Sequence, residues 1–203
     1  MSFSRDDALE SLIDAGRRLD QRGWVPATSG NLSVRLDEDR IAITVSGAHK
    51  GHLGEKDILL VDAEGRSLDA RKPSAETALH CQIYRRNPTA GAVLHPHSPG
   101  ATLLSKQKAQ EVVLEGYELL KALEGITTHD TAVALPIFPN DQDIPRLAAL
   151  IDDWMNRHGM PKAYLIRQHG FYTWAGGVKE ALRQVEALEF LFDLETRLLT
   201  TVR

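Results

Sequence analysis

The chain has 203 residues, 42% of them hydrophobic and 26% charged, which suits one compact domain with its own core. With 24 basic and 28 acidic residues, its formal net charge of −4 argues against binding nucleic acid or anionic membranes by bulk electrostatic attraction. A single cysteine, Cys81, excludes an internal disulfide and favours a reducing, cytoplasmic location. No apolar run reaches the roughly 20 residues of a membrane span, and the polar N-terminus is unlike a secretory signal.

Hydrophobic periodicity and turn residues divide the chain into alternating helices and strands. In chain order the patterns predict a helix over 4–22, strands over 32–36, 41–45 and 58–61, a helix over 74–86, a strand over 92–95, helices over 99–105 and 112–124, a strand over 132–137, a helix over 141–158, strands over 163–167 and 171–174, and a helix over 179–199. No repeat or linker interrupts this series. It predicts a single layered domain over residues 1–203 that combines helices with a mixed sheet.

Three histidines fall at the ends of predicted strands. His95 and His97 flank Pro96 directly after the strand over 92–95, and residues two apart in extended chain point to the same side. His169 follows the strand over 163–167. Three imidazoles at strand ends resemble an open catalytic zinc site. The spacing alone leaves a second interpretation open, in which these are unrelated polar side chains at strand termini.

The remaining histidines carry no such pattern. His80 follows Glu76 on one predicted helix at the spacing of a surface ion pair. The others are predicted to be exposed bystanders in polar loops or at a helix end: His49, His52, His129 and His158.

Three short turns combine small residues with hydroxyl or amide groups. They are Thr28-Ser29-Gly30-Asn31, Ser46-Gly47, and Ser74-Ala75 at a predicted helix start. Glycine allows close approach of backbone N–H groups to a ligand, and a helix N-terminus favours an anion. Each turn alone is ordinary, and none matches a nucleotide-binding glycine motif. Together with a metal site they favour a small phosphorylated substrate.

Two glutamates could transfer protons during a reaction. Glu76 lies near the start of the helix over 74–86, where it could also simply oppose the helix dipole. Glu118 lies in the predicted helix over 112–124, where it could also be an ordinary residue of the solvent-facing side. The residues alone do not decide between the catalytic and the structural interpretation.

Five motifs occur in an order that resembles the class II aldolase and adducin family over nearly the whole chain. They are Thr28 to Ser33, Ser46-Gly47, Lys72-Pro73-Ser74-Ala75-Glu76, His95-Pro96-His97-Ser98 and Gln168-His169-Gly170. The resemblance implies a three-layer αβα fold with a central mixed, mostly antiparallel sheet, assembled as a homotetramer with active sites between subunits. It implies one Zn²⁺ per subunit on His95, His97 and His169. It also implies that the substrate phosphate is bound by Gly30, Asn31, Ser46, Gly47 and Ser74.

The resemblance also implies an activity on a small sugar phosphate. The stretches 115–123, 165–174 and 190–193 are most similar to family members that remove water from such a substrate. In those dehydratases the position of Glu118 carries the acid/base, whereas in the aldolases the position of Glu76 does. This chain has both residues, and we favour Glu118. The alternatives are an aldolase or epimerase on the same site, or a non-catalytic interaction module like the adducin head, which need not keep the three histidines.

Overall fold

A computed structural model describes residues 5–69 and 71–201. Their strands form one eight-stranded sheet in the order β3-β2-β1-β4-β8-β7-β6-β5, antiparallel throughout except for the parallel pair β6 and β7. The strands are β1 (Asn31–Arg35), β2 (Ile41–Thr44), β3 (Ile58–Val61), β4 (Ala92–His95), β5 (Glu111–Glu115), β6 (Ala132–Phe138), β7 (Ala163–Ile166) and β8 (Gly170–Ala175). The mixed, mostly antiparallel sheet is as predicted.

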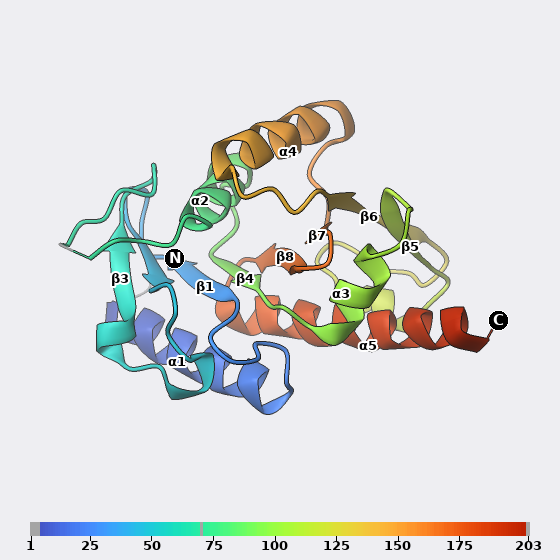
Figure 1. The fold of residues 1–203 in the computed structure, drawn as a ribbon, viewed down its shortest axis with the longest axis horizontal. Coiled ribbons are helices and arrows are strands. Elements are labelled where there is room, and N and C mark those ends of the chain that lie inside the picture. The colour runs from blue at the N-terminus through green and yellow to red at the C-terminus, as the bar shows by residue number, and fades with distance from the viewer. Residues whose placement is uncertain (1–4, 70, 202–203) are drawn as a thin grey trace.

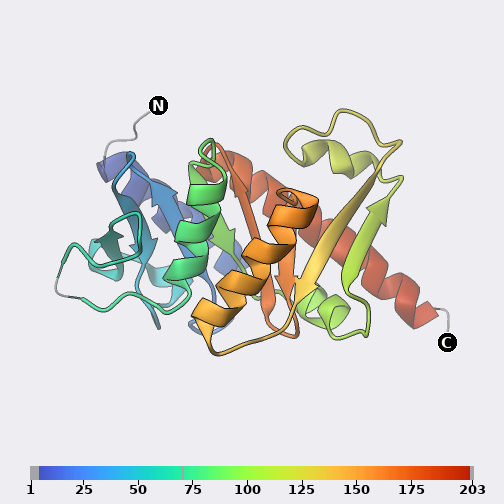
Figure 2. The same ribbon diagram turned by 90° about the horizontal axis from the view of Figure 1, so that it is seen from above.

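Helices cover both faces of this sheet (Figures 1 and 2). The α-helices are α1 (Arg5–Gln21), α2 (Thr77–Arg86), α3 (Pro99–Ser105), α4 (Ile144–His158) and α5 (Val178–Thr201), and the 3-10 helices are η1 (Lys50–His52), η2 (Glu55–Asp57) and η3 (Glu118–Ala122). α1 and α5 lie on one face, and α2 and α4 on the other (Figure 1). Of the helices described, none has a stretch long and apolar enough to cross a membrane.

Alternation along the central strands divides the core into two parts, one on each face. Leu94 of β4 and Phe171 of β8 belong to the part beneath α1 and α5, whereas Val93 and Tyr172 belong to the part beneath α2 and α4. Successive strand residues point to opposite faces, so each strand serves both cores. This packing produces the three-layer αβα arrangement that the family resemblance implies.

The register brings the ends of three strands together. Asn31 of β1 lies opposite His95 of β4, and β4 in turn pairs with β8. Gly30 precedes this meeting point with φ of +77°, and a Cβ there would lie 2.6 Å from the His95 carbonyl oxygen. Glycine is therefore required where β1 begins beside the end of β4.

The predicted helix over 112–124 is wrong. The chain instead forms β5, turns at Gly116 with φ of +73°, and continues into η3. Val112 and Val113 are β-branched and favour the strand that pairs with β6. Glu118 consequently begins a short 3-10 helix between two strands rather than lying on a long amphipathic helix.

Candidate metal centre

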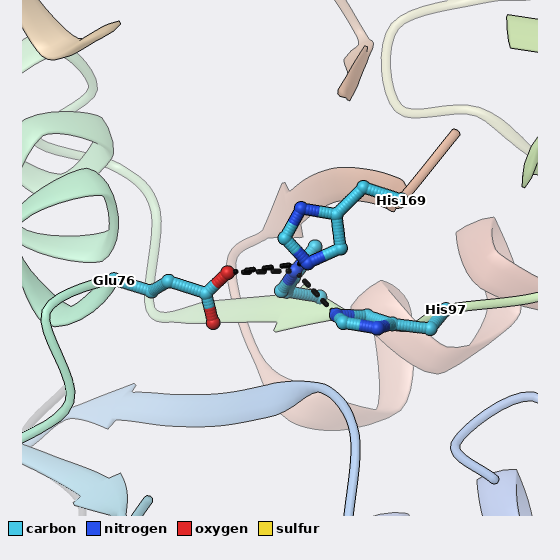
Figure 3. A group of neighbouring side chains, drawn as sticks. Glu76, His97 and His169 are labelled. Carbon is cyan, nitrogen blue, oxygen red and sulfur yellow. Dashed lines mark hydrogen bonds and ion pairs between the residues drawn. The ribbon is translucent and has the colours of Figure 1, made fainter. Parts of the chain in front are cut away.

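The three predicted histidines meet at one point, together with Glu76 (Figure 3). One ligand atom from each of the four residues lies within 4.8 Å of the others. The Nε2 atoms of His95 and His97 are 2.9 Å apart. Glu76 Oε1 is 3.6 Å from His95 Nε2 and 3.3 Å from His169 Nε2. We call these four residues the His₃Glu cluster.

His95 is held by contacts from β8. Its Nδ1 lies 2.8 Å from the carbonyl oxygen of Phe171, which can only accept a hydrogen bond, so Nδ1 carries the proton. The ring stacks on Tyr172 with centroids 3.9 Å apart and an interplanar angle of 8°. These contacts leave Nε2 unprotonated and aimed at the cluster, which is the arrangement of a metal-binding imidazole.

His97 and His169 are placed by backbone contacts. The amide of His97 donates to the carbonyl oxygen of Trp24 at 2.8 Å. His169 lies in the turn between β7 and β8, where Thr102 Oγ1 donates to its carbonyl oxygen at 3.2 Å. A Cβ on Gly170 would lie 2.2 Å from the Pro96 carbonyl oxygen, so this turn packs directly against the His95-Pro96-His97 segment.

Glu76 reaches the cluster from the N-terminal end of α2. It occupies the N-cap position, and Asn31 Nδ2 donates a short hydrogen bond to its Oε2, which leaves Oε1 facing the histidines. Asn31, expected to bind phosphate, thus also orients the carboxylate. The Oγ of Ser74, in the third predicted anion turn, accepts from the Glu76 amide at 3.3 Å.

Burial and mutual charge set the protonation states of the cluster. Burial, reinforced by neighbouring His95, lowers the pKa of His97 to about 2 and that of His169 to about 4. Burial alone raises the pKa of Glu76, but the neighbouring histidines, His95 above all, outweigh burial and lower that pKa to about 2. At neutral pH, His97 and His169 are therefore neutral and Glu76 is ionised.

This donor set fits a divalent metal ion. Metal ligands must be deprotonated, and three neutral imidazoles with one carboxylate oxygen satisfy that requirement. The Nε2 atoms of His95 and His97 face each other at 2.9 Å, and His169 Nε2 lies 3.3 Å from the Glu76 carboxylate oxygen. A cation among these atoms would be bound by the lone pairs of the three Nε2 atoms and of the carboxylate.

The first two anion turns are joined by a lysine that the sequence patterns missed. Lys50 Nζ donates to the carbonyl oxygens of Thr28 at 2.9 Å and Ala48 at 2.7 Å, one beside each turn. Its residue is only 1% exposed. The only sequence signal was its position shortly after Ser46-Gly47, and a lysine in a polar loop normally lies on the surface.

Glu118 is not part of the His₃Glu cluster. Its side chain is 74% exposed, and its carboxylate lies 2.5 Å from Lys121 Nζ and 3.4 Å from His129 Nδ1. The Lys121 hydrogen bond holds the pKa of this carboxyl below its usual range. η3 connects β5 to β6, the two strands at the end of the sheet opposite to β3, and packs against α5.

The predicted surface pair of His80 and Glu76 is wrong. His80 is fully buried because α2 is covered along most of its length, and its Nδ1 lies 2.7 Å from Ser33 Oγ. Ser33 Oγ in turn lies 2.9 Å from the hydroxyl of Tyr84. Of the four histidines predicted to be exposed bystanders, three are exposed, namely His52, His129 and His158. The fourth, His49, is half-buried.

Comparison with known proteins places this geometry in a family. The model described as class II aldolase and adducin N-terminal domain matches residues 10–196. A methylthioribulose-1-phosphate dehydratase of Methylococcus capsulatus is 66% identical over 187 residues, 92% of each chain. One of Pseudomonas aeruginosa is 53% identical over 205 residues, 100% of each chain.

Solved structures share the fold. The crystal structure of L-fuculose-1-phosphate aldolase from Thermus thermophilus is 26% identical, covers 98% of both chains and has a TM-score of 0.75. A sugar-phosphate aldolase from Thermotoga maritima, 20% identical over 98% of this chain and 97% of that chain, has a TM-score of 0.71 and shows likeness of fold alone.

Proposed function

This chain belongs to the class II aldolase and adducin family, and we propose that it is a lyase that removes water from 5-methylthioribulose 1-phosphate. The product is 2,3-diketo-5-methylthiopentyl 1-phosphate, and the reaction serves methionine salvage. The observation that carries the proposal is the intact His₃Glu cluster in a chain 66% identical to a relative named for this dehydration. We place the reaction in the cytoplasm, because the one cysteine, Cys81, is a buried free thiol.

We propose Zn²⁺ as the metal, one ion per subunit, held by His95, His97 and His169. The support is the ligand chemistry, since three neutral imidazoles are typical of catalytic zinc sites that keep an open position. When bound, the ion would supply Lewis-acid polarisation of the substrate carbonyl oxygen. The phosphate of the substrate is assigned to the turns at Gly30, Asn31, Ser46, Gly47 and Ser74.

The dehydration itself requires two proton transfers. As the C3–H bond breaks, its electron pair forms a C3–C4 double bond and the C4–O bond breaks. The departing hydroxide takes a proton to leave as water. The resulting enol then takes up a proton at C4 and loses the proton of its C3 hydroxyl, which gives the second ketone. One carboxylate that accepts the C3 proton and returns a proton to the leaving group performs both transfers.

We propose Glu118 as this carboxylate, acting in the site of a neighbouring copy, with Glu76 as the alternative. Glu76 has both oxygens engaged, one by Asn31 and one by the histidines that would hold the metal. Glu118 contacts Lys121 and His129, but its side chain is 74% exposed, so a second subunit can reach the carboxylate. This assignment requires the homotetramer with shared active sites, and it makes assembly a condition for activity.

The activity is tested with the purified, metal-loaded protein and 5-methylthioribulose 1-phosphate. We expect ultraviolet absorbance of the diketone and no two- or three-carbon fragment. A chelator and His97→Ala should both abolish turnover, whereas His158→Ala at an exposed helix end should retain it. Release of a carbon fragment would instead identify an aldolase, and an unchanged carbon skeleton with no loss of water would identify an epimerase.

The role of Glu118 is tested by mixing subunits. Glu118→Gln alone should lose roughly 10²–10⁴-fold in kcat. Co-assembled Glu118→Gln and His97→Ala subunits should regain activity, because one supplies an intact metal site and the other an intact Glu118. The matched control mixes Glu76→Gln subunits with His97→Ala subunits. This mixture should not recover activity, because each change damages the cluster of its own subunit and no intact cluster remains. Near-normal turnover by Glu118→Gln would transfer the role to Glu76.

A further inference from the structure

Lys50 is a buried cation that has no carboxylate partner in the described part of the chain. Its residue is 1% exposed, and among the residues that the structure describes no carboxylate lies within ion-pair distance of its Nζ. Its two contacts there are the carbonyl oxygens of Thr28 and Ala48. Burying an unpaired charge costs free energy of folding, so we expect this ammonium to be compensated by a negative charge that the described residues do not supply.

The surroundings of Lys50 indicate that the compensating charge is a bound anion. Thr28 opens the turn that continues to Gly30, and Ala48 directly follows Ser46-Gly47, so the ammonium lies between the first two anion turns. An ammonium has three N–H donors, and the two carbonyls account for two of them. Burial lowers the pKa of Lys50 to about 8, partly opposed by Glu76, so the group stays mostly charged at neutral pH.

We propose that Lys50 is the cation of the phosphate subsite, and that its third N–H binds an oxygen of the substrate's phosphate group. The two carbonyl contacts hold the turns in place, and the charge compensates the dianion that the turns bind through uncharged groups. This inference rests on the proposed function for the identity of the substrate, but not for the presence of a phosphate site.

Inorganic phosphate is the probe that tests the site without turnover. We expect calorimetry to show binding to the wild-type protein, and Lys50→Met to weaken it roughly 10- to 100-fold, the effect of losing one charge-assisted hydrogen bond. Lys56→Met is the matched control, because Lys56 lies in the neighbouring η2 and is exposed. If folded Lys50→Met and the wild type bind phosphate with equal affinity, Lys50 only holds the two turns together and the proposal is wrong.

A measurement on the wild-type protein covers the case in which Lys50→Met does not fold. Lysine labelled with ¹³C at Cε gives one NMR resonance per lysine. Lys50 is buried, so its resonance is the one that a paramagnetic cosolute broadens least. Saturation with phosphate should move this resonance and leave that of Lys56 in place. Phosphate binding with no change in the Lys50 signal would contradict the proposal.

Steady-state kinetics separate this inference from the proposed function. Lys50→Met should raise KM for 5-methylthioribulose 1-phosphate far more than it lowers kcat, whereas Lys56→Met should change neither. If the wild type binds phosphate through Lys50 but does not dehydrate this substrate, the subsite stands and the proposed function falls. If the wild type dehydrates it and Lys50→Met keeps the same KM, the function stands and the subsite assignment falls.

Discussion

The imidazole of His95 has its orientation set by one strand, through the Phe171 carbonyl and the Tyr172 ring. The Tyr172 hydroxyl is buried without a partner among the described residues, so the ring rather than the oxygen makes the contact. We expect Tyr172→Phe to keep metal affinity, and Tyr172→Leu to lower it roughly 10- to 100-fold, as for other residues that orient a metal ligand. Competition with a chromogenic chelator measures both. Equal losses in the two variants would show that the hydroxyl, not the stack, matters.

His80 should make the folded state sensitive to acid. Burial, reinforced by neighbouring His95, lowers its pKa from 6.5 to about 3. Between these values the unfolded chain binds a proton that the folded protein does not, so the free energy of unfolding falls as the pH decreases. From pH 6.5 to pH 5 we expect His80→Gln to lose about 1–2 kcal/mol less than the wild type. Urea unfolding at both values measures this, and parallel losses would show that His80 takes no part.

Two buried groups, Lys50, which the sequence patterns missed, and His80, which they misplaced, show the limits of such patterns. His95, His97 and His169 were found because a strand end and a spacing of two define their geometry locally. Lys50 and His80 look like surface residues in sequence, and only the packing of α2 over β1 and of η1 beside two turns buries them. Burial of a polar group depends on partners far along the chain, which periodicity does not report.

At the scale of elements, the approach of β1 to β4 controls the geometry of the site. Gly30→Ala should destabilise the fold more than Gly23→Ala, although both glycines have positive φ, +77° and +72°. A Cβ at Gly23 meets nothing within 4 Å, so its cost is the backbone strain of about 1–2 kcal/mol. At Gly30 the Cβ would lie 2.6 Å from the His95 carbonyl oxygen, which adds about 1–3 kcal/mol. Equal midpoints in urea would refute this close approach.

The elements that the sequence predicted well are those whose first and last residues are set by neighbouring residues in the chain, such as caps and turns. The expected strands over 58–61 and 92–95 and the expected helix over 99–105 coincide with β3, β4 and α3, the last opened by the Ser98 cap. The segment over 112–124 failed because its apolar spacing fits a helix, while its β-branched residues and Gly116 fit a strand and a turn. The pairing of β5 with β6 decides the outcome, and that contact is non-local.

At the scale of the whole molecule, one apolar surface adjoins the element that carries Glu118. A cavity of about 660 Å³ lies between α3, η3 and α5 and is lined by Leu103, Leu119 and Phe190. These side chains are 47%, 37% and 56% exposed, respectively. Large apolar side chains gathered around a cavity are typical of a surface that another protein covers. A second copy seated here would cover η3, which Glu118 begins, and so bring that residue to an interface.

This surface gives a prediction that joins assembly to activity. Phe190→Glu should reduce the molar mass measured by light scattering, because a carboxylate would be buried in the contact. The same variant should lose turnover of 5-methylthioribulose 1-phosphate while keeping its bound metal, because each metal site would lack the neighbour's Glu118. Leu68→Glu is the control, since Leu68 is 51% exposed and lies near β3, at the opposite end of the sheet. A fully active monomer of Phe190→Glu would return the proton transfer to Glu76, the carboxylate that each subunit already holds beside its own histidines.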